Sequence, residues 1–464
     1  MAAMSPDAAR PAPAGNAIVI GAGFSGLSAA VRLARGGAGV VVLEARSRLG
    51  GRATAFPDRE TGEIVDNGQH VLAGCYTDTL AFLEDIGAAS HVRLPTHLAV
   101  TMVDRDGVMS RLACAPLPSP LHLVSGVFDW EALSWRDRLS VLKMAGPLRL
   151  ARQALMPGAT VLAASPGETV ESWLVRNGQT PRIREMLWEP LALAALNQPA
   201  HVAAAPPFAR VLAEMFGPDP RAAAIGLPTR PLDAMYAEPA RTVIEAMGGT
   251  VRTGVTALIH LGPSGCTVET GAERFSPEVV IAAVAWHALP DLFTGETAPL
   301  EGTLASARAT AASPIVTVNL WFDRPILEEA FVGLPGRRMQ WVFDKRFVVG
   351  DSASHVSLVS SGATEGLTRS NTDLIAAAHD ELRAALAACR EATLLRGTVV
   401  REPRATFSLA PGQPQRPDTT TGVSGLFLAG DWVATGLPAT IESAVRSGRW
   451  AADAALAFMR SRAA

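Results

Sequence analysis

After a short segment rich in proline and alanine, the chain shows two apolar runs separated by a helical repeat. The β-branched run at 17–20 predicts a strand, and apolar residues then recur at helical spacing as far as the glycines at 36–37. A second apolar run at 39–43 predicts another buried strand. Strand, helix and strand in this order predict a βαβ unit.

The spacing of apolar positions changes further along the chain. From about 93 to 227 the pattern predicts helices punctuated by proline, one of them opened by a capping box of Ser165 and Glu168. Pro181 predicts the start of a further helix, and Pro190 within it predicts a kink.

Strand-like patterns return in the second half of the chain. They occupy 247–285, and alternating positions at 311–322 and 340–349 predict a second sheet. The buried run at 425–432 predicts one more strand, followed by a helix from about 440 to 459. Dinucleotide-type segments therefore occur at the start, middle and end of the chain, which predicts an interleaved topology.

Composition narrows the class of protein. With 464 residues the chain is too long for one compact core, so two domains are expected. Hydrophobic residues make up 48% and the mean hydropathy is +0.20, but no window of 18 apolar residues is free of charge or proline, so no transmembrane helix is expected. Basic and acidic residues number 41 and 44, a near balance that gives no indication of nucleic-acid binding.

Cysteine usage and the N-terminus bear on the compartment. The four cysteines lie far apart without CxxC spacing, which argues against a disulfide framework and against a metal site. The N-terminus lacks an apolar stretch behind basic residues, so no signal peptide is expected. The expected location is the cytoplasm.

A glycine motif lies between the first strand and the first helix. Gly21, Gly23 and Gly26 have the spacing that brings a pyrophosphate close to a helix N-terminus, where unpaired N–H groups favour anions. Glu44, at the end of the second strand, is placed to accept a hydrogen bond from a ribose 2′-hydroxyl. A tight turn without a ligand is the alternative.

A second glycine pair follows Glu44. Gly50 and Gly51 stand between Arg46 and Arg52, so the backbone can approach a pyrophosphate and Arg52 can neutralise it with several donors. Enzymes that use a nicotinamide cofactor do not need this second contact with the pyrophosphate, whereas proteins that hold FAD permanently often have one. A basic surface loop is the alternative.

The C-terminal segment adds a third part to the candidate site. A buried strand leads to Gly430 and Asp431, where the carboxylate is placed to accept from ribityl hydroxyls. The next helix begins near Pro438, Ala439 and Thr440, and its positive end favours the negative charge of a reduced flavin.

Together these segments resemble a known group of enzymes. The stretches GAGFSGL…LEARSRLGGR and GLFLAGDW…TGLPATIESAVRSG resemble the amine-oxidase and phytoene-desaturase superfamily of FAD enzymes. DNGQHVLAGCY and LWEPLALAALNQP are more narrowly similar to the hydroxysqualene dehydroxylase family, also called squalene-associated FAD-dependent desaturases of hopanoid biosynthesis. The resemblance covers nearly the whole chain.

The resemblance implies an α/β fold in which a Rossmann-type FAD-binding domain of amine-oxidase type is interleaved with a substrate domain of mixed sheet and helices. The expected FAD-binding segments are 15–92, 228–300 and 400–464, the substrate segments are 93–227 and 301–399, and 1–14 is expected to be a disordered tail. The resemblance also implies that FAD contacts a backbone group of Val255 through its adenine and that other contacts come from Gly21, Gly23, Gly26, Glu44, Arg52 and Asp431.

The stretch DNGQHVLAGCY follows a short strand at 64–65. Asn67 and Gly68 form a turn dipeptide, and the resemblance places Gln69 and His70 beside the flavin. A simple hairpin turn explains Asn67 and Gly68 equally well, but not the two residues directly behind them. Cys75 is interpreted as a buried thiol.

The reaction that the resemblance implies is reductive removal of the allylic hydroxyl of hydroxysqualene, which yields squalene for hopanoid and other triterpenoid synthesis. A general acid protonates the leaving hydroxyl, and hydride from the reduced flavin quenches the allylic cation. The candidate acids are His70 and Glu189, and burial in an apolar run would raise the pKa of Glu189. A structural histidine and a helix-surface carboxylate are the alternatives.

Three other functions remain open at this stage. A carotenoid or phytoene-type desaturase needs the same fold and the opposite redox direction. An amine oxidase is a weaker alternative because the chain has only two tyrosines, Tyr76 and Tyr236, to hold an amine. A flavin-containing binding protein without turnover is the third. FAD is expected to be non-covalent because no cysteine lies in the C-terminal flavin segment, and the sequence does not identify the electron donor.

The expected substrate is a long isoprenoid, which partitions into membranes. The segment 138–167 carries Arg138, Lys143, Arg149 and Arg152, no acidic residue, and interspersed leucines. This pattern predicts either a peripheral contact with anionic lipid at the inner face of the cell membrane or a helix whose leucines line the substrate cavity.

Overall fold

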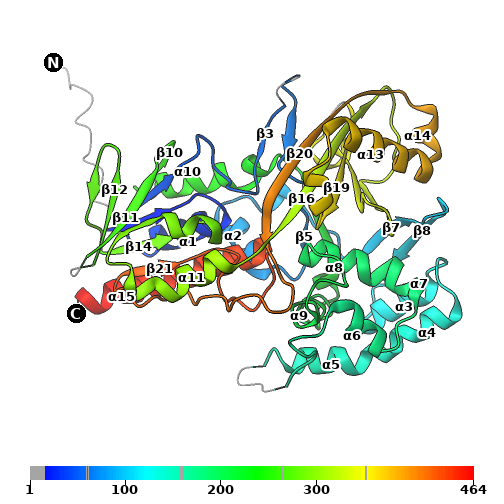
Figure 1. Ribbon diagram of the computed structural model, residues 1–464, viewed down its shortest axis with the longest axis horizontal. Helices are drawn as coiled ribbons and strands as arrows, with labels where there is room; N and C mark the ends of the chain where they lie inside the picture. The colour runs from blue at the N-terminus through cyan, green and yellow to red at the C-terminus, as the bar shows by residue number, and fades with distance from the viewer. Residues whose placement is uncertain are drawn as a thin grey trace, which may run out of the picture.

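The computed structural model describes residues 16–58, 60, 62–156, 161–262, 265–350 and 353–463. The tail expected at 1–14 lies outside the described residues. Two bodies built on β-sheets lie side by side, and a group of helices packs below the second (Figure 1).

The first body contains a five-stranded parallel sheet that includes the predicted βαβ unit. β1 pairs with β2 on one side and with β14 on the other, so strands far apart in the sequence are neighbours. Most of these strands are fully buried, which explains their continuous apolar runs. In sheet order the strands are β10 (Thr250–Thr253), β2 (Val40–Glu44), β1 (Ala17–Ile20), β14 (Val279–Ala282) and β21 (Leu426–Leu428).

Both faces of this parallel sheet are covered. One face packs against helices, and the other packs against a small second sheet. The helices are α1 (Phe24–Arg35), α10 (Glu238–Ala246) and α15 (Ile441–Ala463). The small sheet consists of β13 (Arg274–Phe275), β12 (Gly265–Thr270), β11 (Ala257–Gly262) and β15 (Phe293–Gly295).

The second body is a seven-stranded mixed sheet with helices α13 (Asn371–Ala385) and α14 (Ala387–Glu391) on one face. The strand predicted at 311–322 is confirmed, whereas the one predicted at 340–349 stops at Asp344, whose side chain caps the short helix α12 (Lys345–Val348). In sheet order the strands are β20 (Leu394–Phe407), β16 (Ala312–Phe322), β19 (Ser354–Ser361), β18 (Trp341–Asp344), β17 (Phe331–Gly333), β7 (Ala99–Val103) and β8 (Met109–Ala113).

The helical prediction for 93–227 is wrong at its beginning. β7 and β8 form an antiparallel hairpin, and Gly107 in the turn adopts φ +80°. The Asp-Gly pair at 106–107 is a turn signal for such a hairpin, and β7 is then completed by a parallel partner, β17, more than 200 residues away. The two parts of the expected substrate domain therefore share one sheet.

Helices make up most of the remainder of this region. The helix predicted to start at Ser165 begins instead at Val170, because Thr169 is the residue that caps it together with Ser172. Thr169 itself forms a β-bridge with Ala204, so the backbone at this point pairs with another segment and does not extend the helix. The helices here are α3 (Leu121–Asp129), α4 (Trp135–Val141), α5 (Ala145–Gln153), α6 (Val170–Arg176) and α9 (Ala205–Met215).

The helix start at Pro181 is confirmed, and the irregularity at Pro190 is explained by a widened turn. Between α7 (Pro181–Ile183) and α8 (Glu189–Leu196) the chain forms a π-helical turn at Arg184–Trp188. Proline has no N–H to donate to the preceding turn, so the wider turn accommodates Pro190 without breaking the run.

The remaining elements are short and lie outside the three sheets described above. They are β3 (Ala55–Pro57), β4 (Ile64–Asp66), β5 (Leu72–Ala73), β6 (Val92–Arg93), β9 (Ile225–Pro228), α2 (Thr77–Asp85) and α11 (Glu301–Ala309). The domain division stays a prediction, and its boundary at residue 400 falls inside β20. Along the described parts of the chain, no helix has the length and apolar character needed to cross a membrane.

Candidate active site

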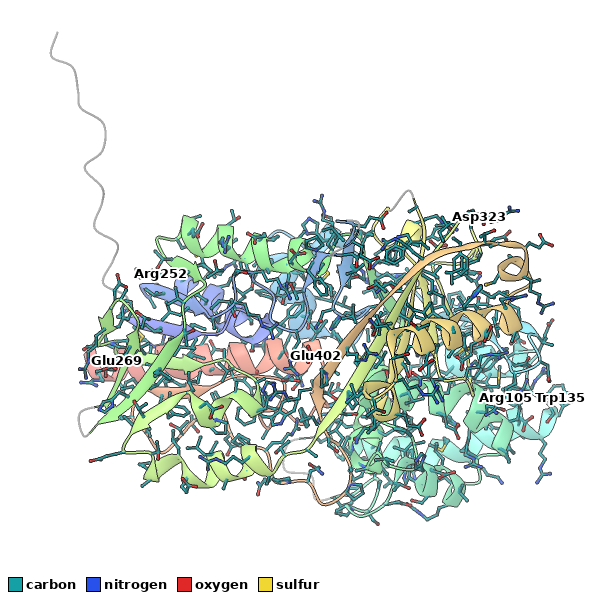
Figure 2. The ribbon with its side chains drawn as sticks, turned by 45° about the horizontal axis from the view of Figure 1, so that its top comes forward. Arg105, Trp135, Arg252, Glu269, Asp323 and Glu402 are labelled. Atoms are coloured by element: carbon teal, nitrogen blue, oxygen red, sulfur yellow. The ribbon has the colours of Figure 1, made fainter. Side chains whose placement is uncertain are left out.

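A cavity of about 590 Å³ is lined by residues of both bodies. One part of its lining, which we call the glycine end, comes from the glycine loops of the parallel sheet. The other part, which we call the apolar end, comes from the seven-stranded sheet, α8 and β9 and includes Ile315, Phe331, Trp341, Phe343 and Val359. Glu402 of β20 lies near the middle of the molecule, between the two bodies (Figure 2).

Most residues predicted to bind the cofactor line the glycine end. Gly26 lies under the loop and does not line the cavity, and Pro438 lines a smaller second cavity. The predicted residues that do line it are Gly21, Gly23, Glu44, Arg46, Gly50, Gly51, Arg52, Gln69, Val255, Gly430, Asp431, Ala439 and Thr440.

The first glycine loop is too tight for side chains. Gly21 has φ +104°, and a Cβ atom there would lie 2.5 Å from the carbonyl oxygen of Ala283. A Cβ on Gly26 would lie 1.9 Å from the carbonyl oxygen of Gly21. The loop ends at Gly23, the N-cap of α1, where no side chain caps the helix and no acidic residue lies in the first turn. Its N–H groups are therefore open to an anion.

The second glycine pair touches the first loop. A Cβ on Gly51 would lie 3.2 Å from the Cα of Gly23, so the two backbones meet without side chains between them. Arg46 donates to the carbonyl of Gly51 over 3.1 Å and adds positive charge at this point. The two loops form one cradle suited to a pyrophosphate.

Backbone groups fix the carboxylate of Glu44. One oxygen accepts from the N–H of Ala22 at 2.8 Å, and the other accepts from the N–H of Arg46 at 2.9 Å. Val255 donates its own N–H to the carbonyl of Glu44 at 2.9 Å. A contact from Val255 to adenine would therefore have to use its carbonyl or side chain.

Arg52 and Asp431 form an ion pair across the cavity. Their closest nitrogen and oxygen are 2.6 Å apart, and Arg52 also donates to the carbonyl of Ala405 at 2.8 Å. Burial alone would lower the pKa of Arg52, but the neighbouring Asp431 outweighs it and raises that pKa. The pair joins a residue of the first cofactor segment to one of the last.

The N-terminus of α15 also faces this end. Thr440 caps the helix, its hydroxyl accepting from the N–H of Ser443 at 3.1 Å, and Ala439, Thr440 and Ile441 line the cavity. The uncapped start of α1, the cradle and this second helix end suit a large anionic dinucleotide. The residues at the glycine end fit FAD.

The loop predicted to approach the flavin is anchored from below by a buried ion pair. Lys345 lies 2.5 Å from a carboxylate oxygen of Asp66 and donates to the side-chain oxygen of Gln69 at 2.9 Å. Asn67 donates to the carbonyl of Arg52 at 3.1 Å, which ties the loop to the second glycine pair. Gln69 and His70 both line the cavity.

His70 is held in one tautomer. Its Nδ1 lies 2.7 Å from the carbonyl oxygen of Gly68, so Nδ1 carries the hydrogen and Nε2 is left as an acceptor. Burial lowers the pKa of His70, with Gly68 and Asp66 acting against this shift. The imidazole is therefore neutral near pH 7 and becomes an acid only at lower pH.

Glu189, the other candidate acid, lies outside the lining of both cavities. The later residues of α8, Ala194 and Ala195, line the cavity instead. Burial does raise the pKa of Glu189, as its apolar neighbours predicted, with the nearby Arg184 opposing the shift. The structure therefore gives no support to Glu189 as the acid, because its carboxylate is not among the groups that line the cavity.

Several lining residues were missed in the sequence. Asn197 ends α8 in a left-handed conformation and binds Ser313, Thr406 and Gly362 through its side chain. His287 also lines the cavity, and burial, with Arg404 and Arg52 nearby, lowers its pKa to about 4. His287 belongs to none of the motifs described above, whereas Asn197 lies in the stretch LWEPLALAALNQP and has the positive φ that is typical of a helix C-cap.

A second cavity of about 60 Å³ adjoins the first, sharing Tyr76, Ala195 and Thr440 with it. Cys75 lines it and is half-buried, whereas a buried thiol was predicted; its surroundings still raise the pKa of the thiol to about 12, so it is not activated. Among the described residues no cysteine lines the main cavity. None of the residues described within 138–156 and 161–167 lines either cavity, so the structure does not support a substrate-lining role for the leucines there.

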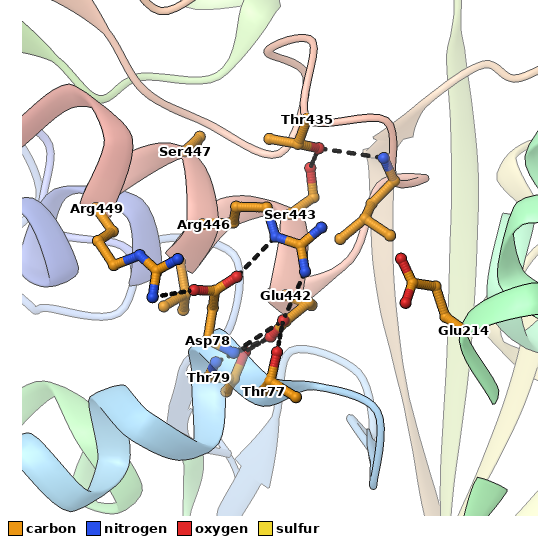
Figure 3. Close-up of polar contacts among 12 residues, drawn as sticks. Thr77, Asp78, Thr79, Glu214, Thr435, Glu442, Ser443, Arg446, Ser447 and Arg449 are labelled. Atoms are coloured by element: carbon orange, nitrogen blue, oxygen red, sulfur yellow. Dashed lines mark hydrogen bonds and ion pairs between the residues drawn. The ribbon is translucent and has the colours of Figure 1, made fainter. Parts of the chain in front are cut away.

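A polar cluster beside the second cavity joins α2 to α15 (Figure 3). Glu442 is buried and accepts from the N–H groups of Asp78 and Thr79, each at 2.9 Å, at the start of α2. Arg446 donates to Asp78 at 2.6 Å and to Glu442 at 3.2 Å. The carboxylate thus caps one helix from the first turn of another.

Residues 24–456 match the family described as flavin containing amine oxidoreductase. The chain is 31% identical to hydroxysqualene dehydroxylase of Rhodopseudomonas palustris, covering 96% of this chain and 99% of that protein. It is 28% identical to hydroxysqualene dehydroxylase of Zymomonas mobilis, with 94% and 98% covered. It is also 27% identical to a 15-cis-phytoene desaturase of Glycine max, with 96% and 80% covered.

Solved structures share the fold at lower sequence identity. An oxidoreductase from Methanosarcina mazei superposes with a TM-score of 0.72 at 17% identity, covering 94% of this chain and 99% of that one. Cyclohexylamine oxidase from Brevibacterium oxydans superposes with a TM-score of 0.70 at 16% identity, covering 97% and 100%. The predicted fold class is confirmed.

Proposed function

Because this chain belongs to the hydroxysqualene dehydroxylase family of the flavin-containing amine oxidoreductases, and is therefore an FAD-dependent oxidoreductase, we propose that it reductively removes the allylic hydroxyl of hydroxysqualene to give squalene. The reaction breaks the C–O bond, takes up a proton to release water, and forms a C–H bond with a hydride. FAD, when bound and reduced, supplies that hydride.

The observation that most directly supports the proposal is that one cavity contains both the cradle suited to FAD and an apolar end. Phe331, Trp341 and Phe343 line this end together with aliphatic side chains from β16 and β19. Ile315, Val359 and these three aromatic residues offer no charge to a substrate, so a long hydrocarbon is the ligand they suit.

The protein holds FAD through groups already in place. With FAD bound, the starts of α1 and α15, the two glycine loops and Arg52 would hold its anionic and carbonyl groups, and Glu44 and Asp431 would accept from its hydroxyls. We propose that FAD is bound non-covalently, since no cysteine lines this cavity in the described residues. Acid precipitation should release all of the yellow chromophore, and chromophore in the washed pellet would refute this.

His70 is the residue that we assign to the proton transfer. It lines the cavity, and its Nε2 is an acceptor in the neutral form and a donor once protonated. In the neutral form it can orient the substrate hydroxyl by accepting from it. In the protonated form it can donate to the leaving oxygen.

A phytoene-type desaturase is the second candidate function, favoured by the similarity to the Glycine max desaturase. It uses the same cavity with oxidised FAD as the hydride acceptor. An amine oxidase has less support, because an aromatic cage needs more than one ring: Tyr236 stacks on Phe24 and bonds the backbone of Gly50, so Tyr76 is the one tyrosine in the described lining of the cavity.

The deciding experiment is anaerobic. The purified protein is reduced with dithionite, synthetic hydroxysqualene is added, and flavin absorbance is followed together with extracted product by mass spectrometry. Flavin reoxidation with stoichiometric squalene is the expected result. Flavin that stays reduced with no squalene formed would overturn the proposal, and phytoene would then be tested with the oxidised protein.

A further inference from the structure

Exposed apolar side chains gather in one region of the molecule. Of the eighteen large hydrophobic side chains that are exposed among the described residues, nine lie between residues 117 and 162. Monomeric proteins seldom leave such clusters in water without a partner. Trp135 is 66% exposed and stands at the outer edge of the helical region (Figure 2).

These side chains lie on one continuous helical run. α4, a 3₁₀ turn at Leu142–Met144 and α5 follow each other without leaving right-handed helical backbone, from Trp135 to Ala154. Side chains at 137, 140, 144 and 151 are buried and recur at intervals of three, four and seven residues, which places them on one side of a helix. They hold the run against the protein, and Met144 and Ala151 belong to its core.

The opposite side of the run is apolar and basic. Its exposed apolar residues are Trp135, Leu139, Leu142 and Leu150, with Met156 just beyond its end. Its exposed charged residues are Arg136, Lys143, Arg149 and Arg152. We call these nine side chains the basic apolar face.

No negative charge offsets this face along the run. Between 132 and 156, all of which the structure describes, the one acidic residue is Asp137, which is buried against Ser134 and Thr180. None of the four basic side chains is paired with a carboxylate within the described part of the chain. Tryptophan, leucine and unpaired cations on one helix side match the boundary of an anionic bilayer.

The face also lies close to the cavities. α5 packs on α9, and Val211 and Met215 of α9 line the second cavity. The second cavity shares Tyr76 and Ala195 with the main cavity. Any partner that binds to the exposed side of α5 is thus separated from the second cavity by α5 itself and by α9.

We propose that the basic apolar face docks the protein on the surface of an anionic lipid bilayer, with the apolar side chains among the acyl chains and the cations at the headgroups. The proposal goes beyond the reaction and does not rest on it. Each cation near an anionic surface strengthens binding about fivefold, so neutralising three should weaken it about a hundredfold.

The test uses the FAD-loaded protein and vesicles without any isoprenoid. Wild-type protein is sedimented with vesicles of phosphatidylcholine alone and of phosphatidylcholine with one quarter phosphatidylglycerol. Strong binding to the anionic vesicles, weakened by added salt, is expected. Equal binding to both vesicle types, or no binding, would overturn the proposal without bearing on the dehydroxylation.

Two variants separate the two parts of the face. The triple change Lys143→Gln, Arg149→Gln and Arg152→Gln should lose about a hundredfold in affinity for anionic vesicles. The triple change Leu139→Gln, Leu142→Gln and Leu150→Gln should lose at least tenfold. If the leucine variant loses FAD or helicity, the charge variant alone decides.

Matched controls come from exposed residues elsewhere. Met247→Gln with Leu395→Gln, and Arg230→Gln with Arg460→Gln, change exposed apolar and exposed arginine side chains on other elements, outside both cavities, and should bind like wild type. Wild-type binding by both face variants would contradict the proposal. A concentration-dependent dimer in sedimentation velocity that the leucine variant abolishes, with no vesicle binding by wild type, would assign the face to a second copy of the chain.

Discussion

At the residue scale, a single ion pair joins two cofactor segments that are nearly 400 residues apart. Arg52 and Asp431 were each predicted to contact FAD, one at the pyrophosphate and the other at the ribityl chain. In the structure they contact each other while both still line the cavity. Each residue therefore positions the other's charged group.

Replacing Asp431 with asparagine should weaken FAD binding at least tenfold, because Arg52 loses its partner and the site loses an acceptor. The protein should also lose about 2 kcal/mol of stability, since the arginine is left mostly buried and unpaired. FAD retention on gel filtration and denaturant unfolding measure the two effects. Asp453→Asn, which removes the exposed pair with Arg32, should change neither. Equal losses in both variants would contradict the assignment.

His70 gives a pH prediction whose sign follows from its lowered pKa. A general acid works in its protonated form, so the single-turnover rate should rise as pH falls through a value below the ordinary imidazole pKa of about 6.5. His70→Gln should slow the reaction and remove this dependence. His201→Gln, at an exposed position, should keep it. A rate that is independent of pH in wild type would exclude His70 as the acid.

At the element scale, local patterns and distant partners contribute differently. β1, α1 and β2 were predicted because their apolar runs and glycines are contiguous in the sequence. The hairpin of β7 and β8 was missed because its short strands are completed by β17, which no local pattern reveals. Glu189 was misplaced for a related reason, since the side of a helix that faces a cavity depends on tertiary packing.

Glu442 shows how one element stabilises another. Its carboxylate caps α2 from the first turn of α15 and is almost fully buried. Glu442→Ala should reduce the free energy of unfolding by about 2 to 4 kcal/mol, because it removes charge-assisted hydrogen bonds and leaves buried N–H groups unpaired. Denaturant unfolding of the FAD-loaded protein measures this loss. Glu84→Ala, exposed on α2 itself, should cost less than about 0.5 kcal/mol. Similar losses would mean that the cap is not the cause.

At the scale of the whole molecule, the cavity draws its lining from Ile20 to Ala444. The cofactor residues in glycine motifs were predictable because backbone constraints leave a signature in the sequence. Asn197, His287 and Glu402 were not, because a place in the cavity wall that depends on tertiary packing leaves no signature in the local sequence. The sequence thus predicted most of the residues at the glycine end, but it did not predict those that line the apolar end.

Because FAD touches segments from the whole chain, its removal should destabilise the entire protein. A ligand that is present at a thousand times its dissociation constant adds about 4 kcal/mol. The melting temperature of the FAD-free protein should therefore be clearly lower and should rise again with added FAD. Identical melting temperatures, measured by intrinsic fluorescence with and without FAD, would show that the cavity walls are held together without it.

The strand order of the parallel sheet also constrains how the protein is made. β1 can pair with β14 only after β14 has been synthesised, and β14 can pair with β21 only after β21 has. The sheet therefore cannot be completed until nearly the whole chain has left the ribosome. At about 5 to 20 residues per second, synthesis as far as β21 takes roughly 20 to 85 seconds. Until β14 has emerged, the second edge of β1 has no native partner, and an unpaired strand edge of this kind makes a nascent chain prone to aggregation.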